Sequence, residues 1–263
     1  MIVQFIFDLP CLLIVCSGIL GALIACPNRR QALALAALIC LAIGAMGTLI
    51  GWVKMRSNLS VPEAFGKASS VATLPLLYAF MLWPILRTLS TRFPEQSSPT
   101  DPDHGKVQIR WLSALTVIAA VLLAAIGWKS SMVAYVDLIA IILVAFFVGL
   151  PSLLQKESTA DSDQLLSRCI SMRHNSLVCT TIGTLFGCAS LLWGGSDHTL
   201  IGPMMAVPLL TTLYCGFIVV GTTVSYQVLS DKADSYSQSH ILAYTGLVAL
   251  TILMFNAVLF WIF

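Results

Sequence analysis

The chain has 263 residues, of which 58% are hydrophobic and 10% are charged, and its formal net charge at pH 7 is +2. Soluble domains carry roughly half apolar and about a quarter charged residues, so this composition excludes an ordinary soluble protein and indicates a polytopic membrane protein. The small net charge does not suggest a nucleic-acid partner, and the basic residues are explained better as topology signals in a lipid bilayer.

Eight stretches are apolar enough to be predicted as membrane spans, since a span needs about 20 mainly apolar residues. We expect α-helices, because outer-membrane barrels have short alternating segments instead and a helix satisfies its own backbone in lipid. The predicted fold class is an all-α polytopic membrane protein of about eight spans. The expected spans are approximately 8–26, 33–53, 69–89, 110–128, 133–154, 175–195, 203–228 and 240–262.

The distribution of basic residues predicts the orientation. The first span is preceded by no Lys or Arg and followed by no evident cleavage site, so we expect it to be retained rather than removed as a signal peptide. With residue 1 outside, ten Lys and Arg residues, Arg173 among them, fall on inner connections and four on outer ones. The positive-inside rule then places both termini outside.

A sequence repeat runs along the chain. MGTLIG at 46–51 is similar to IGTLFG at 182–187, and the offset of 136 residues holds without a gap to LLY at 76–78 and TLY at 212–214. The pairing aligns Gly47, Gly51 and Tyr78 with Gly183, Gly187 and Tyr214, and we expect these six residues to form a helix-packing motif. A weaker similarity at a nearby offset pairs FDLP at 7–10 with VDLI at 136–139. These similarities predict a tandem duplication in two parallel repeats, because each unit would hold four spans.

The repeat and the polar stretches divide the chain into four parts. We expect a first repeat of three spans, a cytoplasmic linker, a second repeat of four spans, and a cytoplasmic turn with a final span. These parts are 1–89, 90–109, 110–228 and 229–263. Neither the Pro- and Ser-rich linker nor the connection at 155–174 is long enough to bury its own core.

Ionisable residues are missing from the centres of the predicted spans. Asp8 and Asp137 lie at span mouths, and His174 and His240 lie at the cytoplasmic edges. A proton pump or secondary transporter normally needs an ionisable group inside the membrane, so the chain alone has no predicted proton carrier. It also lacks a nucleophile–base pair, a CxxC pair and a Cys/His cluster. We therefore predict no enzyme, no metal site and no cofactor.

Small residues and hydroxyls at helical spacing are found in the spans instead. Two helix faces carry such residues. The face on 175–195 consists of Thr180, Thr184 and Gly187, with Thr181 beside it, and the face on 33–53 consists of Gly44, Gly47, Thr48 and Gly51. Small residues at such spacing let the backbones of neighbouring helices approach closely in lipid.

Two interpretations of these hydroxyls remain open. The first is helix packing, with hydroxyls bonded to the carbonyl one turn back or repairing the backbone near Pro208, and with Asn256 bonded across helices. The second is functional: Thr184 and either Thr211 or Thr212 on the next span would face a shared cavity. They would then form a neutral wall that hydrogen-bonds water or a carboxyl group brought by another chain.

These stretches resemble the MotA/TolQ/ExbB proton-channel family, the wall-forming subunits of ion-driven motors in bacterial inner membranes. IGTLFG at 182–187 is similar to the motif on that family's third helix, and GPMMAVPLLTTLYCG at 202–216 is similar to its fourth-helix motif. FDLPCLLIVCSGILGALIACPNRR at 7–30 is similar to the second helix of the MotA branch and the basic turn that follows. Together these three stretches hold 45 of the 263 residues, about a sixth of the chain.

The resemblance implies a subunit of a homo-oligomeric ring around a single-span partner of the MotB/ExbD/TolR type, which supplies the membrane Asp. By motif position, Thr184 and Thr212 correspond to the two threonines that line the family's ion path, with Thr211 and Thr180 beside them. In the first repeat Thr48 keeps the third-helix position, whereas Leu76 stands where Thr212 does in the second. The implied location is the bacterial inner membrane, with both termini in the periplasm.

The leading hypothesis is a non-enzymatic ion-channel or stator subunit that couples proton or sodium flow to mechanical work. The large cytoplasmic domain of the MotA branch is replaced here by short connections, so contact with a flagellar rotor is not expected. One alternative is a transporter or pore with a solute path between its own two repeats. Another is a non-conducting membrane scaffold in which every small-residue motif serves packing.

Overall fold

The computed structural model describes residues 8–26, 28–55, 62–93, 104–127, 132–154, 161–194, 198–230 and 235–262. Within these ranges the regular structure is helical and no strand occurs, which confirms the all-α fold class. Among the described residues, five helices are long and apolar enough to cross a membrane, and three shorter helical segments are also apolar. The chain is a helical, multi-pass membrane protein.

Each predicted span coincides with a helical segment, although the boundaries differ. In chain order the elements are α2 (Leu9–Ala25), α3 (Arg29–Met55), α4 (Pro62–Arg92), α5 (His104–Gly127), the 3-10 helix η2 (Met132–Tyr135), α6 (Leu138–Val144), the π-helical turn η3 (Ala145–Gly149), α7 (Leu150–Leu154), α8 (Asp161–Gly194), α9 (His198–Ser230) and α10 (Ser235–Ile262). The five candidate spans lie in α3, α4, α8, α9 and α10. The apolar parts of α2, α5 and the α6–α7 segment are only 10–17 residues long.

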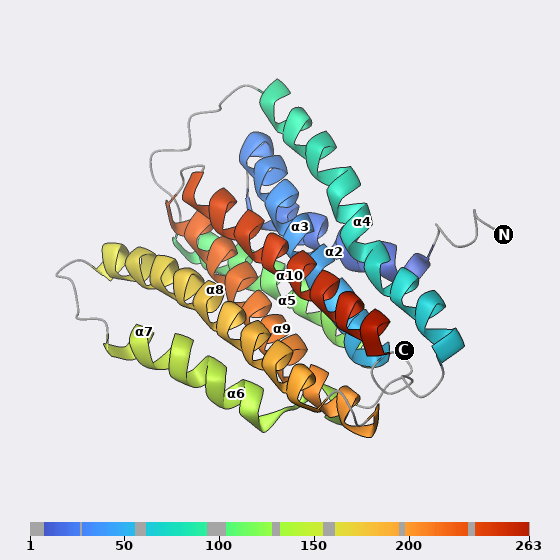
Figure 1. Ribbon diagram of the computed structural model, residues 1–263. Coiled ribbons are helices and arrows are strands. Elements are labelled where there is room, and N and C mark those ends of the chain that lie inside the picture. The colour runs from blue at the N-terminus through green and yellow to red at the C-terminus, as the bar shows by residue number, and fades with distance from the viewer. Residues whose placement is uncertain are drawn as a thin grey trace.

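Helix α3 lies at the centre of the bundle (Figure 1). It packs along α2, α4 and α9 and also contacts α5 and α10. Its most apolar window is 89% buried, whereas that of α4 is 33% buried. The stretch ALALAALICLAIGAMG at 32–47 explains this position, because its small residues allow neighbouring backbones to approach from several sides.

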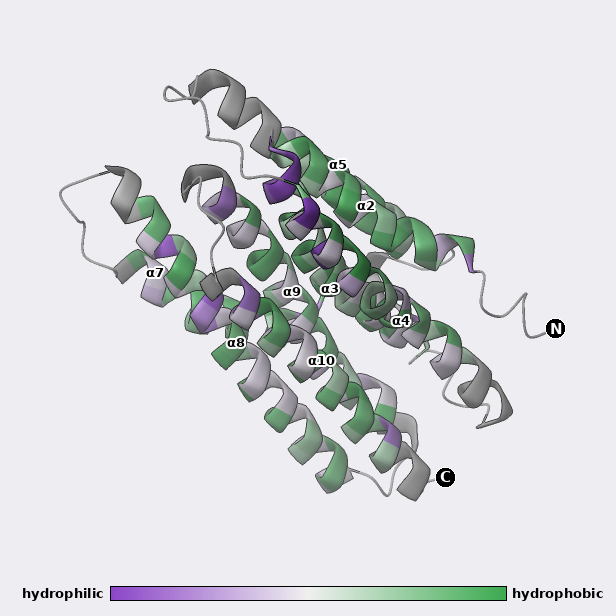
Figure 2. Cartoon of the chain, turned by 90° about the horizontal axis from the view of Figure 1, so that it is seen from above, coloured by the Kyte–Doolittle hydropathy of each residue, from purple (hydrophilic) through white to green (hydrophobic). Residues whose placement is uncertain are grey.

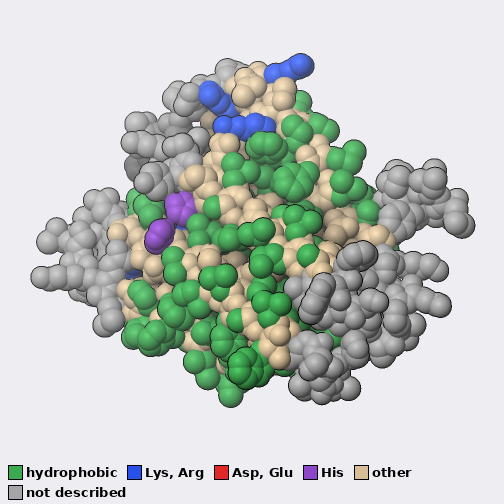
Figure 3. Space-filling view, viewed as in Figure 1, with side chains coloured by type: hydrophobic (Ala, Val, Ile, Leu, Met, Phe, Trp, Pro, Cys, Tyr) green, Lys and Arg blue, Asp and Glu red, His purple; other side chains and the backbone are tan. Residues whose placement is uncertain are grey.

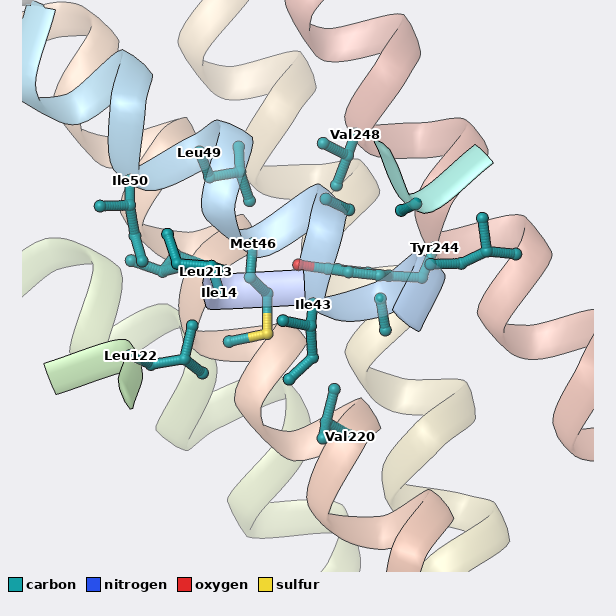
Figure 4. Packing of buried hydrophobic residues seen from close by; sticks show 14 of the residues in the cluster. Ile14, Ile43, Met46, Leu49, Ile50, Leu122, Leu213, Val220, Tyr244 and Val248 are labelled. Carbon is teal, nitrogen blue, oxygen red and sulfur yellow. The ribbon is translucent and has the colours of Figure 1, made fainter. Parts of the chain in front are cut away.

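The side chains around α3 form one apolar core (Figure 4). Ile43, Met46 and Leu49 of α3 meet Leu213 of α9 and Val248 of α10 in this view. The contact between the halves of the chain is therefore apolar at this level, and it fixes α9 and α10 against the central helix.

Aspartates mark the start of two equivalent helices. Asp8 is the N-cap of α2, which has a proline in its first turn. Asp137 is the N-cap of α6, and its Oδ1 accepts a hydrogen bond of 2.9 Å from the backbone N–H of Ala140. The two helices thus begin at equivalent aspartates, in line with the similarity of FDLP and VDLI, but only the Asp137 side chain caps its helix with a hydrogen bond.

The predicted span 133–154 is not one regular helix. It consists of η2, a short extended link, α6, the π-helical turn η3 and α7. Pro151, in the first turn of α7, has no N–H to give to the carbonyl four residues before it, which accounts for a widened turn at this point. The turn directs Val148 into the protein and leaves Phe146 exposed.

Two predicted connections are shorter than expected. The linker 90–109 is helical at both ends, because α4 continues to Arg92 and α5 begins at His104, while 94–103 lie outside the described residues. The connection 155–174 is also mostly helical, because α8 begins at Asp161. At 1.5 Å per residue the 34 residues of α8 span about 51 Å, so this helix extends well beyond a hydrocarbon core of about 30 Å.

Basic residues gather at one end of the bundle. Arg29 and Arg30 begin α3, and Arg87 and Arg92 lie near the end of the antiparallel α4. Figure 3 shows Lys and Arg side chains at this end above a wide hydrophobic surface, and Figure 2 shows helices that are green along most of their length. At the other end of α3, Lys54 Nζ donates a 2.6 Å hydrogen bond to the carbonyl of Ala125, in the last turns of α5.

Candidate functional site

Two antiparallel helix pairs, α3 with α4 and α8 with α9, have the most extensive contacts in the structure. In the first pair a Cβ built on Gly47 would lie 2.9 Å from Cβ of Pro75. In the second, a Cβ built on Gly183 would lie 2.8 Å from Cγ2 of Thr211. Both members of the second contact follow those of the first by 136 residues, so the contacts are equivalent in position.

The next turn of each pair makes a second equivalent contact. A Cβ on Gly51 would lie 2.7 Å from Cβ of Ala72. At the same offset, a Cβ on Gly187 would overlap the ring of Pro208. The glycines that the sequence predicts to serve helix packing therefore all lie where two backbones approach too closely for a larger residue.

The two tyrosines of the repeat have equivalent hydrogen bonds rather than a packing role alone. The hydroxyl of Tyr78 accepts from the backbone N–H of Asp8 at 3.3 Å, and that of Tyr214 accepts from the N–H of Asp137 at 3.4 Å. The Tyr214 hydroxyl also donates to the carbonyl of Tyr135. Each tyrosine thus holds the backbone of the N-cap aspartate of one helix of its own half, Asp8 of α2 or Asp137 of α6.

The two helix pairs differ in the residues that line their contact. In the first pair the lining positions are apolar or lack a side chain, whereas in the second they carry hydroxyls and thiols. The first-pair residues are Ile43, Gly44, Pro75, Leu76 and Ala79, and their counterparts are Cys179, Thr180, Thr211, Thr212 and Cys215. All five counterparts are at most 1% exposed. Because the first pair packs in the same way without them, packing does not require these polar groups.

Threonine hydroxyls in helices ordinarily bond the carbonyl one turn back. Thr48 of the first pair donates to the carbonyl of Gly44 at 3.0 Å. Further along α9, Thr223 donates to the carbonyl of Val219 at 2.6 Å. These hydroxyls are satisfied within their own helix, as the packing interpretation expects.

Three hydroxyls at the α8–α9 contact are not satisfied in this way. The Oγ1 atoms of Thr180, Thr211 and Thr212 are buried and have no geometrically acceptable hydrogen-bond partner among the described residues. The Thr180 hydroxyl lies beside the thiol of Cys215, which is a weak partner. Backbone repair near Pro208 does not explain Thr211 or Thr212, since neither hydroxyl bonds a carbonyl. A buried hydroxyl in this state costs about 1–3 kcal/mol.

Thr184 is bonded to a different helix. Its Oγ1 lies 3.1 Å from Oγ1 of Thr251 on α10. Thr251 also donates to the carbonyl of Leu247 at 2.7 Å, and a hydroxyl has one hydrogen, so Thr184 is the donor between the two threonines. Helix α10 therefore covers the threonine face of α8.

Tyr244 attaches α10 to α9. Its side chain is fully buried, and its hydroxyl donates a 3.0 Å hydrogen bond to the carbonyl of Thr212. Gly216 makes this approach possible, because a Cβ there would overlap the Tyr244 hydroxyl. In Figure 4 the Tyr244 hydroxyl points toward Met46 of α3.

A cluster of charged and aromatic residues lies at one end of the same helices. Arg173 is fully buried in α8, with its guanidinium carbon 4.8 Å from the centroid of the Tyr226 ring on α9. The rings of His174 on α8 and His240 on α10 are 6.4 Å apart and nearly perpendicular. The prediction that Arg173 belongs to a solvated cytoplasmic connection is wrong, because α8 begins twelve residues earlier, at Asp161, and carries Arg173 into the bundle.

The structure brings four of the five predicted path threonines together. Thr180 and Thr184 lie on α8 on either side of Gly183, which packs against Thr211 of α9, and Thr212 follows Thr211 on α9. Thr48 is apart from them, in the first helix pair, with its hydroxyl bonded to its own helix. The site is thus confined to the second half of the chain and is closed by α10.

Sequence reasoning missed Thr251, Tyr244 and Arg173. The signal was available as helical spacing: His240, Tyr244 and Thr251 are separated by four and seven residues and share a face of α10. Arg173 precedes Thr180 by seven residues and continues its face in the same way.

The expected role of Asn256 is also wrong. Its Nδ2 donates to the carbonyl of Ile252 at 2.9 Å within α10, and not across helices. The carbonyl one turn earlier in the same helix accepts this hydrogen bond.

All eight cysteines are free thiols. No group of three or more His, Cys, Asp or Glu side chains is gathered within the described ranges. The polar groups that line the α8–α9 contact between Cys179 and Cys215 are neutral hydroxyls and thiols, which can donate and accept hydrogen bonds but carry no fixed charge; the charged Arg173 lies nearer one end of the same pair of helices.

Comparison with family models, curated proteins and solved structures gives no match for this chain.

We predict that Gly183→Ala lowers stability, because the new methyl group must displace Thr211 from the α8–α9 contact. The expected loss is about 1–3 kcal/mol, the usual cost of overpacking. Thermal unfolding in detergent measures it. Gly221→Ala is the matched control on α9, since a Cβ there meets no atom within 4 Å. Equal stability of the two variants would contradict the close approach.

We predict that Thr211→Val raises the stability of the protein, because valine keeps the shape of threonine and removes an unsatisfied hydroxyl. The expected gain is about 1–3 kcal/mol. Thr223→Val is the control: it removes a hydroxyl that is bonded to Val219, and it should leave stability unchanged or slightly lower. A Thr211→Val chain that unfolds at a lower temperature than the Thr223→Val chain would show that the Thr211 hydroxyl is satisfied.

Proposed function

We propose that the protein is an ion-conducting subunit of the stator type, in which the hydroxyl cluster at the α8–α9 contact forms one wall of a path for protons or sodium. The observation that carries this proposal is the set of three buried hydroxyls without acceptable partners among the described residues, Thr180, Thr211 and Thr212. The equivalent contact of α3 with α4 is apolar, so the cluster is an addition to the packing and not a condition for it.

The chemistry of a hydroxyl suits this role. It can accept a hydrogen bond from a protonated carrier and donate one to an ionised carrier, and its oxygen can coordinate a sodium ion. A pre-placed, unsatisfied hydroxyl also needs no internal bond to be broken when the ion arrives. Its cost in the resting protein, about 1–3 kcal/mol, is recovered when the ion or carrier binds.

A carrier with a carboxylate has to come from outside this wall. The described side chains of α8, α9 and α10 include no Asp or Glu. In line with the family resemblance, we assign the carrier to a single-span partner with a membrane Asp, around which several copies of this chain assemble. Protonation of that Asp would change its affinity for the threonine wall and bias the motion of the ring.

The two halves of the chain are assigned different roles. The equivalent contacts of Gly47 and Gly183 and the equivalent bonds of Tyr78 and Tyr214 support an origin by tandem duplication. The first half supplies the central helix α3 and keeps its one path threonine bonded internally. The second half carries the path, so a single wall per chain takes part in conduction.

The proposed location is the bacterial inner membrane, with both termini in the periplasm. The arginines at the start of α3 and the end of α4 support this orientation, since basic residues favour the cytoplasmic side.

The alternatives are less well supported by the contacts. A solute path between the two halves would need polar groups between α3 and α9, but the core there consists of residues such as Met46, Leu49 and Leu213. A pure scaffold leaves three unsatisfied hydroxyls without a purpose, although valine at each position would fill the same space.

We predict that Thr184→Val and Thr212→Val each lower ion flux while the complex stays assembled. A hydrogen bond to a charged group contributes roughly 1.5–3 kcal/mol, which corresponds to about tenfold or more in rate. The complex would be purified in mild detergent, weighed by mass measurement and reconstituted in vesicles with a pH-sensitive dye, with a sodium gradient as the second arm.

Thr48→Val is the matched control, because Thr48 holds the position equivalent to Thr184 but bonds its own helix. It should leave the flux unchanged. Unchanged flux in the Thr184→Val and Thr212→Val chains, with the mass of the complex unaltered, would exclude the threonine wall and favour the scaffold.

A further inference from the structure

Helix α10 contacts one helix of each half, and the two helices are equivalent in the repeat. It packs against both α3 and α8, the helices that carry the equivalent Thr48 and Thr184, and contacts α9 less extensively. In Figure 1 it runs between these elements. The two halves therefore leave one groove between α3 and α8, and the last helix of the chain occupies it.

The fit of α10 in this groove is specific. Tyr244 and Phe255 are both fully buried, and the Tyr244 hydroxyl enters a space that exists only because residue 216 is glycine. On its other side α10 exposes Leu250 and Leu253, as expected for a helix that faces lipid. One face of α10 thus matches the groove and the opposite face does not.

Thr251 is the residue of α10 that meets the threonine wall. It is fully buried and accepts the hydrogen bond of Thr184 over 3.1 Å. A carboxylate that served this wall as an ion carrier would need the same place, because it must receive the Thr184 hydroxyl. Helix α10 contains no Asp or Glu, and its side chain at this position, Thr251, ends in a neutral hydroxyl.

We infer that the groove between α3 and α8 is a seat for one transmembrane helix, and that α10 is its resident occupant. Thr251 stands at the carrier position of that seat. This inference rests on the proposed function, and it specifies where a carrier helix binds: in the place that α10 holds, so α10 has to leave that place before a partner's carboxylate reaches Thr184 in the conducting complex. With α10 seated, the threonine wall is closed by a side chain that cannot take up and release a proton at neutral pH.

The inference predicts that Thr251→Asp gives the chain proton flux of its own, without a partner. The introduced carboxylate would accept the hydrogen bond of Thr184 when ionised, and protonation would make it a neutral donor, so it can cycle as a carrier. In vesicles that contain only the purified chain, we expect Thr251→Asp to conduct protons about tenfold faster than Thr251→Asn. Thr251→Asn is the matched control, since the amide has the shape of the carboxyl group but does not titrate.

Combining Thr251→Asp with Thr184→Val should return the flux to the level of Thr251→Asn. A folded Thr251→Asp chain that conducts no faster than Thr251→Asn would overturn the inference, with folding judged by thermal unfolding in detergent.

A second measurement holds even where the buried carboxylate prevents folding. The pair Thr184→Cys with Thr251→Cys should form a disulfide on mild oxidation in membranes, because the two Oγ1 atoms are 3.1 Å apart. Thr184→Cys with Thr245→Cys is the control, since Thr245 bonds the carbonyl of Ile241 within α10. Absence of the 184–251 cross-link would show that α10 does not occupy the seat.

Failure of the proposed function has a different signature. In that case Thr184→Val and Thr212→Val leave the native flux unchanged, whereas the 184–251 cross-link still forms.

Discussion

The close approach of α8 to α9, and of α3 to α4, is the contact on which the rest of the structure depends. At Gly183 and Gly187 the backbone of α8 meets Thr211 and Pro208 of α9 with no room for a methyl group. In lipid, helices gain little from apolar burial as such, so close packing at small residues supplies much of their association. The same proximity brings hydroxyls of two helices to one level. A helix pair held further apart would leave space between them for lipid or larger side chains.

The two halves pack their helix pairs in the same way but line the contacts with different residues. The residues that packing needs can therefore be told apart from those that could serve chemistry. The first half shows that an apolar lining of isoleucine, proline, leucine and alanine is compatible with the contact. The second half has five polar or sulfur-containing residues in the same places, three of them with hydroxyls that lack partners among the described residues. Natural proteins accept such local costs at sites of function. The first half also places α3 at the centre of the bundle, where it supports α9 and α10.

The length of the apolar stretches was enough to predict the eight helical segments, and helical spacing predicted the threonine faces, because IGTLFG and PLLTTLY place their small residues and hydroxyls at regular intervals. It did not predict that Thr251 meets Thr184, since a contact between residues 67 positions apart depends on how α10 packs. The burial of Arg173 was missed because α8 continues beyond its apolar run. The bonds of Tyr78 and Tyr214 were missed because a tyrosine at a helix contact usually signals packing, and the acceptor or donor of its hydroxyl cannot be inferred from spacing.

The short helix η2 connects the two halves through hydroxyl groups. The Tyr214 hydroxyl donates to the carbonyl of Tyr135, and the Tyr135 hydroxyl donates to the carbonyl of Ile50 on α3, at 3.2 Å. Tyr214 lies two residues after Thr212 on α9. A rotation of α9 about its own axis would therefore pull on η2 and, through it, on the central helix. Helix η2 therefore links α9 to α3 through two hydrogen bonds, so a displacement of α9 in the second half would be transmitted to the first half.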